Sequence, residues 1–213
     1  IVVAENMNKL FEMLYQGKGD IISYGITITK ERLENVNFTR YHTKTHQVLV
    51  QRKPDNWRQM KLHEIEEELI RDPLDLIGKQ VHVRESSSYY QRLLNLYDEI
   101  GGEIDIVTVP GNMETEELIR QVANGKINYT ISDENIARIN KTYYSDLDIE
   151  TAVSFNQRVA WAVRQSSPEL LNAVNKWISK MRKETDYYVI YNKYFKNRKA
   201  YKKRVRSDFF SRK

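Results

Sequence analysis

The chain has 213 residues, of which 30% are charged and 40% hydrophobic, with 8 glycines, 4 prolines and no cysteine. This composition is typical of a folded protein with a substantial core, and it excludes collagen-like, mucin-like and disulfide-stapled proteins. No apolar run approaches the ~20 residues that a membrane-spanning helix needs, and no targeting segment with a charged and then an apolar region follows Ile1.

The formal net charge of +5 is concentrated near the C-terminal end of the sequence. Residues 198–213 carry +7, since they hold one acid, Asp208, and eight basic residues: Arg198, Lys199, Lys202, Lys203, Arg204, Arg206, Arg212 and Lys213. The rest of the chain is therefore slightly acidic, at −2. A basic run of this kind is more often a solvated helix end or linker than a nucleic-acid-binding arm, so residues 196–213 are interpreted as a basic linker.

The first part of the chain predicts one helix and two strands. Residues 7–14 carry apolar side chains at helical spacing behind Asn6, which is a suitable N-cap, and Gly17 and Gly19 end the helix. Residues 20–29 are rich in β-branched side chains and predict a buried strand. Residues 48–50 predict another, and the polar segment after them, with its proline, is the first candidate crossover between two lobes.

From residue 74 the pattern alternates between strands and helices. Strands are predicted at residues 80–84, 103–109, 127–131 and 158–163, and helices at residues 89–99, 114–124 and 134–140. Ser167 and Pro168 begin another helix as N-cap and first helical residue, and residues 186–195 are expected to be helical as well. Alternation with glycines between the elements predicts a mostly parallel sheet with helices on both faces.

Three predicted strand ends carry polar side chains. Residues 25–32 end in hydroxyls and Arg32, residues 85–88 form a serine run directly before a helix, and Asp133 follows the strand at residues 127–131. In open α/β sheets, ligands bind beyond the carboxyl ends of the strands, where helix N-termini converge. Together these groups are suited to hold a carboxylate and an ammonium group.

These residues carry a resemblance to a known family. The segments GKGDII (17–22), GITITKER (25–32), VNFT (36–39), LIGKQVHV (76–83), GKINYTISD (125–133) and SPELL (167–171) appear in the order found in bacterial extracellular solute-binding proteins of the polar amino-acid type. The resemblance extends to about residue 195. It implies an α/β, two-lobed, periplasmic-binding-protein-like (type II) fold in which lobe one lacks its first strand and helix.

Within that family the chain is most similar to the regulatory domains of membrane-bound lytic murein transglycosylases. The serine run, NYT at residues 128–130, YYSDL at 143–147 and RSDFF at 206–210 carry this closer resemblance. It implies a periplasmic, outer-membrane-associated protein whose catalytic domain, which cleaves peptidoglycan, lies outside this sequence. The ligand would be an amino acid or a cell-wall peptide, with no cofactor, no metal and no nucleic-acid partner, and the association with the membrane would be peripheral.

The resemblance also assigns roles to individual residues. Arg32 would clamp the α-carboxylate of the ligand, because a guanidinium offers paired donors that match a carboxylate. Asp133 would take the α-amino group. The remaining contacts would come from a lobe-one hydroxyl, backbone and aromatic side chain and from two lobe-two hydroxyls: Thr27, Gly25, Tyr24, Ser87 and Ser88.

Each of these residues also has a purely structural interpretation. Arg32 could pair with Glu31 or Glu34 on a solvated helix, Ser87 or Ser88 could be only an N-cap, and Asp133 could cap the helix after it. The joint placement at three strand ends favours binding. His42 and His46 have the spacing of a helical metal pair but no supporting motif, so they are interpreted as exposed histidines.

The sequence therefore predicts a two-lobed binding domain that closes on its ligand. Lobe one is expected at residues 1–50 and 151–195 and lobe two at 55–148, with crossovers near 51–54 and 149–152. Two other functions stay open from the sequence. One is a free-standing amino-acid receptor of an ABC transporter, and the other is a nucleic-acid-binding module that uses the basic C-terminal run.

Overall fold

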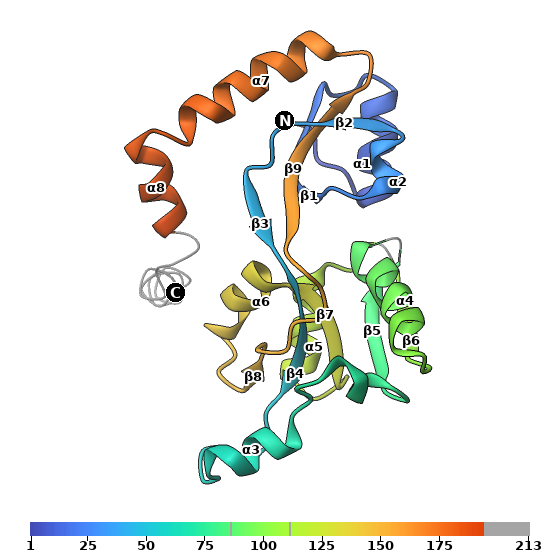
Figure 1. Ribbon diagram of the computed structural model, residues 1–213, viewed down its shortest axis with the longest axis vertical. Helices are drawn as coiled ribbons and strands as arrows, with labels where there is room; N and C mark the ends of the chain where they lie inside the picture. The colour runs from blue at the N-terminus through green and yellow to red at the C-terminus, as the bar shows by residue number, and fades with distance from the viewer. Residues whose placement is uncertain (86, 111, 194–213) are drawn as a thin grey trace, which may run out of the picture.

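Two sheets, each with its own helices, form two lobes stacked along the long axis of the molecule in the computed structural model (Figure 1). The structure describes residues 1–85, 87–110 and 112–193. The basic segment predicted as a linker lies outside these residues. The two-lobed α/β architecture that the sequence predicted is confirmed, because strands from both ends of the chain build one sheet and the middle of the chain builds the other.

The first lobe is an antiparallel sheet covered by helices from the start of the chain. Its strands are β1 (Ile21–Thr27), β9 (Gln157–Arg164), β2 (Val36–Phe38) and β3 (Thr43–Thr45), and the other three all pair with β9. The helix predicted at residues 7–14 is α1 (Met7–Tyr15), and the Asn6 side chain accepts a hydrogen bond from the N–H of Lys9 at 2.9 Å. Its inner face packs Leu14 against Ile22 and Ile26. A short helix, α2 (Lys30–Leu33), follows β1.

The second lobe is a five-stranded sheet with helices on both faces. Its strand order is β6 (Asp105–Val109), β5 (Gln80–Arg84), β7 (Tyr129–Asp133), β4 (Gln47–Arg52) and β8 (Leu147–Asp148). Helix α4 (Ser88–Ile100) packs on one face, and α5 (Thr115–Ala123) and α6 (Glu134–Lys141) pack on the other. The sequence predicted a mostly parallel sheet, and β5, β6 and β7 are parallel. Strand β4 runs antiparallel to both of its neighbours, β7 and β8.

The chain crosses between the lobes at positions that differ from those expected. Strand β4 lies in the second sheet, although the sequence interpretation placed residues 48–50 in lobe one. The crossing therefore falls at His46, between β3 and β4. On the return, the N–H of Val153 still bonds to the carbonyl of Gln47 at 2.9 Å, so the second crossing lies between Val153 and β9. A short apolar strand that is buried on both faces does not show from its sequence which sheet it joins.

Two further helices continue lobe one after β9. Helix α7 (Pro168–Met181) begins at Pro168 as predicted and extends away from the sheet, and α8 (Thr185–Tyr191) follows it (Figure 1). Trp177 of α7 stacks on Trp161 of β9, with ring centroids 5.8 Å apart.

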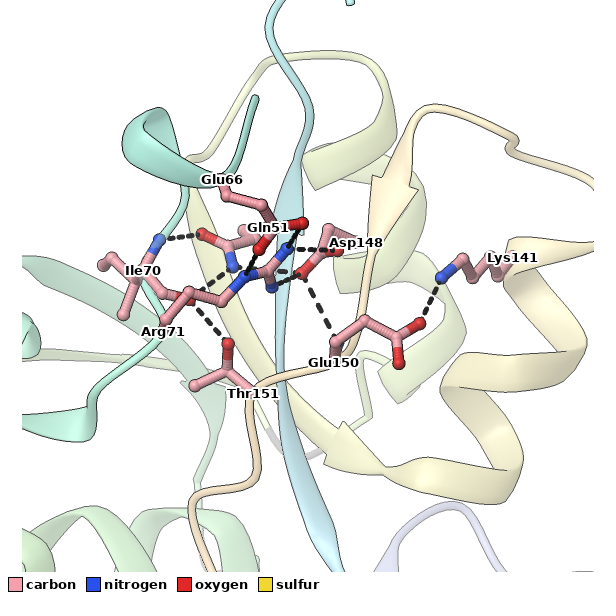
Figure 2. Close-up of polar contacts among 8 residues, drawn as sticks. All are labelled: Gln51, Glu66, Ile70, Arg71, Lys141, Asp148, Glu150 and Thr151. Atoms are coloured by element: carbon pink, nitrogen blue, oxygen red, sulfur yellow. Dashed lines mark hydrogen bonds and ion pairs between the residues drawn. The ribbon is translucent and has the colours of Figure 1, made fainter. Parts of the chain in front are cut away.

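A buried polar network fixes the segment between β4 and β5, which contains α3 (Leu62–Glu68) and the 3-10 helix η1 (Pro73–Leu76) (Figure 2). The side-chain amide of Gln51 bonds both backbone groups of Ile70, at 2.9 and 3.0 Å. Arg71 donates to both carboxylate oxygens of Asp148, at 2.6 and 3.2 Å, and also pairs with Glu66. The network therefore ties the segment to both β4 and β8.

Asp148 is the member of this network whose loss we expect to be most costly. Its burial alone would raise the pKa of the carboxyl, but the hydrogen bonds and charge of Arg71 lower the pKa below its ordinary value. Asp148→Ala leaves the Arg71 and Gln51 donors short of an acceptor. We therefore expect the free energy of unfolding of this variant, measured in urea at pH 7, to be about 3 kcal/mol lower than that of the wild type.

The depressed pKa also fixes how this difference depends on pH. The contribution of Asp148 is present above about pH 4, the unfolded-state pKa, and is lost as pH falls through the lower folded-state pKa, so the difference should shrink at pH 3. Asp55→Ala is the control, because Asp55 forms an exposed pair with Arg52 that should contribute less than about 1 kcal/mol. Equal stability of the Asp148 variant and the wild type at pH 7 would contradict this account.

Candidate functional site

An open cleft of about 1290 Å³ lies between the lobes. Helices α1 and α2 form its lobe-one wall, and the first turns of α4 form its lobe-two wall. The lining residues that matter for binding are an aromatic, a guanidinium and three side chains at the start of α4: Phe11, Arg32, Ser87, Ser88 and Tyr90. Charged side chains of both signs line it as well: Glu12, Lys30, Glu31, Glu34, Glu85 and Arg92. The cleft therefore presents Arg32 among carboxylates on one side and hydroxyls on the other.

Arg32 is held at the cleft by the start of α2. Thr29 is the N-cap and accepts from the N–H of Arg32 at 3.3 Å, while one guanidinium nitrogen donates to the carbonyl of Thr27 at 3.0 Å. Burial lowers the pKa of Arg32; the charge of Glu31 opposes this shift and the charge of Arg84 adds to it, yet a guanidinium stays protonated. Across the described residues, no carboxylate oxygen lies within 4.0 Å of its nitrogens, so the expected alternative of an ion pair with Glu31 or Glu34 is not formed.

Strand β1 bulges just before Thr27. Its pairing with β9 is regular at Ile22 and again at Ile26, and the register shifts between them. Gly25 lies in the shifted segment, where a Cβ would come 3.3 Å from the Val159 side chain. Tyr24 beside it is 49% exposed. Burial raises the pKa of Tyr24, the charge of Arg84 opposes this shift, and carboxylates including Asp133 add to it.

The two serines differ in what their hydroxyls do. Ser87 is the N-cap of α4: it accepts from the N–H of Tyr90 at 3.2 Å and donates to the carbonyl of Arg84 at 2.6 Å. Its hydroxyl proton is therefore engaged within the protein, as the N-cap interpretation expected. Ser88 accepts from the Gln47 amide at 3.3 Å, which leaves its own proton available at the cleft.

Asp133 is a buried carboxyl without a full set of partners. It occupies the N-cap position of α6, but its side chain makes no capping hydrogen bond, and its Oδ1 atom has no partner. Burial raises the pKa of Asp133 to about 6, while hydrogen bonding with the Tyr89 hydroxyl opposes the shift. Asp133 is not among the residues that line the cleft beside Arg32. The Tyr89 hydroxyl is thus a hydrogen-bonding partner of Asp133 in lobe two.

The structure thus brings Arg32, Ser87 and Ser88 to one cleft, and it places Asp133 with Tyr89 outside the lining of that cleft. Thr27 is buried in β1 and contributes its carbonyl to Arg32.

Sequence reasoning missed Arg84. This residue ends β5 and is 8% exposed, and its ion partner is the largely exposed Glu114 at 3.4 Å. Its charge acts on Arg32, Tyr24 and Tyr89. An arginine at the carboxyl end of an apolar strand, directly before the serine run, was the signal that could have identified it. Arg84 itself is not among the residues that line the cleft.

Comparison with known proteins identifies the family of this chain. The model of the bacterial extracellular solute-binding proteins, family 3, matches residues 1–197. The chain belongs to this family. Membrane-bound lytic murein transglycosylase F from Desulfosudis oleivorans is 33% identical over 186 residues, which is 87% of this chain and 38% of that protein. The protein of the same name from Saccharophagus degradans is 28% identical over 81% of this chain and 32% of its own length.

A solved structure has a fold similar to that of this chain. A mutant of ArgBP from T. maritima superposes with a TM-score of 0.72 at 25% identity, over 92% of this chain and 78% of that chain. The chain thus covers most of the length of that solved structure but only about a third of the length of the two transglycosylases. Within its described residues, no helix has the length and apolar character to cross a bilayer, and no three His, Cys, Asp or Glu side chains gather as metal ligands.

The raised pKa of Asp133 predicts that the free energy of unfolding depends on pH. Because its folded-state pKa is raised to about 6, its contribution to stability is full below about pH 4 and is lost as pH rises to about 6. Asp133→Asn should therefore be more stable than the wild type at pH 8, by about 2 kcal/mol, with a smaller difference at pH 4. Urea unfolding at both pH values measures this, with the exposed Asp75→Asn as control for the loss of a charge. A pH-independent difference would contradict the assignment.

Ser87 and Ser88 give a second, matched prediction. Ser87→Ala removes the N-cap of α4 and should lower the unfolding free energy by about 1 kcal/mol. Ser88→Ala should change it by less than half as much, because its hydroxyl supports no helix N–H. Thermal or urea unfolding of the two variants tests the difference, and equal losses would show that Ser87 is not the cap.

Proposed function

We propose that this chain is the ligand-binding regulatory domain of a periplasmic lytic transglycosylase, and that its cleft takes an amino acid or a cell-wall peptide by its carboxylate. The observation that carries the proposal is the guanidinium of Arg32, which faces the cleft from lobe one without a carboxylate partner among the described residues. Arg32 is half-buried and forms no ion pair within 4.0 Å among the described residues, so a ligand carboxylate would find its donors available.

The ligand class follows from the chemistry of the cleft. A guanidinium matches a carboxylate bidentately, and each charge-assisted hydrogen bond contributes about 1.5–3 kcal/mol. Ser88 offers a hydroxyl from the opposite lobe. A ligand that meets both lobes stabilises the closed arrangement relative to the open one, which is the basis of hinge closure.

The hinge contacts lie close to these groups. Gln47, at the first crossing, donates to Ser88 at 3.3 Å and to Gln157 at 3.4 Å, and Gln157 begins the strand that returns to lobe one. Ser88 and Gln157 both line the cleft. A ligand that engages Ser88 would therefore bias the segment about which the lobes move.

Closure would in turn regulate the catalytic part of the whole protein. The two transglycosylase relatives named above are much longer chains, which supports a regulatory domain rather than a free-standing amino-acid receptor. The membrane-bound relatives also support a location in the periplasm at the outer membrane, with the association made by parts of the protein outside this sequence.

Thermal-shift screening tests the proposal. The probes are the twenty amino acids and muropeptides released from peptidoglycan by a muramidase. We expect at least one probe to stabilise the wild type, and Arg32→Ala to weaken its affinity by about 10-fold or more, from the loss of one charge-assisted bond. Arg32→Lys should retain part of the affinity, because it keeps the charge but not the planar pair of donors.

The control is Arg120→Ala, which removes an exposed arginine from α5 in lobe two. Its affinity should equal that of the wild type. No stabilisation by any probe, or undiminished stabilisation of Arg32→Ala, would overturn the proposed function.

A further inference from the structure

Three positive charges converge on one tyrosine ring in lobe one, outside the cleft. The Nζ atom of Lys44 and the Cζ atoms of Arg158 and Arg182 lie 5.5, 5.4 and 5.2 Å from the centre of the Tyr41 ring. Lys44 belongs to β3, Arg158 to β9, and Arg182 is the C-cap of α7. None of these four residues lines the cleft between the lobes. We call them the Tyr41 cluster.

Two charges of the Tyr41 cluster are held directly opposite each other. Strands β3 and β9 are antiparallel, and their register pairs Lys44 with Arg158 (Figure 1). Like charges that face each other across two strands destabilise a sheet. Both residues are exposed, and both cations nevertheless lie over the same ring, whose face attracts positive charge. The fold therefore maintains a local excess of positive charge at this place.

No carboxylate neutralises this excess within the part of the chain that the structure describes. None of its ion pairs includes a cation of the Tyr41 cluster. The acids that follow Arg182 in the chain do not serve it, since Glu184 pairs with Lys180 and Asp186 forms no ion pair among the described residues. Arg182 donates to a neutral acceptor, the carbonyl of Tyr41, at 3.2 Å. The cluster thus has charge and donors to offer to an anion.

The number and type of the donors favour a phosphate group over a carboxylate. A carboxylate carries a single negative charge and is matched by one guanidinium. A phosphate ester carries up to two charges and has three strong acceptor oxygens. Two guanidiniums and one ammonium group can therefore contact separate oxygens of one phosphate.

The surroundings of the cluster are aromatic and apolar. The Tyr187 hydroxyl donates to the carbonyl of His42 at 3.2 Å, which holds α8 beside the segment that carries Tyr41. Three consecutive residues of α8 are more than half exposed: Tyr188, Val189 and Ile190. Basic, aromatic and apolar side chains together are typical of surfaces that meet lipid headgroups. A lipid headgroup and a soluble phosphate ester are thus two sources of the same chemistry.

We propose that the Tyr41 cluster is a binding site for a phosphate group, with Lys44, Arg158 and Arg182 as its donors. The site is separate from the cleft and does not depend on the proposed function. An anion bound there would offset the repulsion between Lys44 and Arg158, so its binding would also stabilise lobe one.

The experiment compares two phosphate probes at low ionic strength, where charges are weakly screened. Glycerol 3-phosphate is titrated by calorimetry, and vesicles of phosphatidylcholine with and without phosphatidylglycerol are sedimented with the protein. We expect the wild type to bind the vesicles that contain phosphatidylglycerol, glycerol 3-phosphate or both. The double variant Lys44→Ala/Arg158→Ala should bind about 10-fold more weakly. Binding of the vesicles alone would support a lipid headgroup as the ligand, and binding of glycerol 3-phosphate would support the phosphate group itself.

The matched control is Lys79→Ala/Lys126→Ala, which removes the same net charge from two exposed lysines of lobe two. It should bind as the wild type does. Equal weakening of the two double variants would show a general effect of net charge, including that of the basic run at residues 198–213, and would overturn the site. Absence of binding to either phosphate probe would overturn it as well.

Thermal unfolding without phosphate gives a second readout. Lys44→Gln removes the repulsion with Arg158, so we expect its Tm to rise by about 1–3 °C. Lys79→Gln should leave the Tm unchanged. An unchanged or lower Tm of Lys44→Gln would show that the protein itself satisfies this charge, and would overturn the site. Neither result bears on binding through Arg32 in the cleft, so the two proposals fail independently.

Discussion

The antiparallel pairing of β4 with β7 is the constraint on which the rest of the molecule depends. Its register sets Gln47 opposite Asp133 and continues through Gln51 opposite Tyr129. Because β4 arrives directly from lobe one, this one pairing fixes where the chain crosses between lobes. It also brings the crossing next to the carboxyl end of β7. The apolar side chains Val48, Leu49 and Val50 are fully buried and divide between the two faces of the sheet. The hydrophobic core of lobe two therefore supports the geometry of the site.

Polar side chains at the two ends of β4 differ in how fully their hydrogen-bonding groups are satisfied. At the far side of β4, Gln51, Arg71 and Asp148 satisfy one another almost completely. At the cleft side, Arg32 lacks a counter-ion among the described residues, the carbonyl oxygen of the Gln47 side chain lacks a donor, and Asp133 keeps an unpartnered oxygen. Unpaired buried groups cost free energy, so a ligand that supplied partners to these groups would stabilise the structure.

The sequence by itself determined most of the secondary structure and the identity of the local caps. Helix α1 behind Asn6, the strand–helix alternation after residue 74 and the helix at Pro168 all follow from periodicity and capping, which act over a few neighbouring residues. It also marked Arg32, the serine run and Asp133 as strand-end groups. Only the tertiary structure decided that β4 joins the second sheet, that Ser87 uses its hydroxyl in the N-cap and that Arg84 is buried with Glu114 as its ion partner. These outcomes depend on which distant segments pair and pack, and contacts between residues far apart in the chain leave no periodic trace in the local sequence.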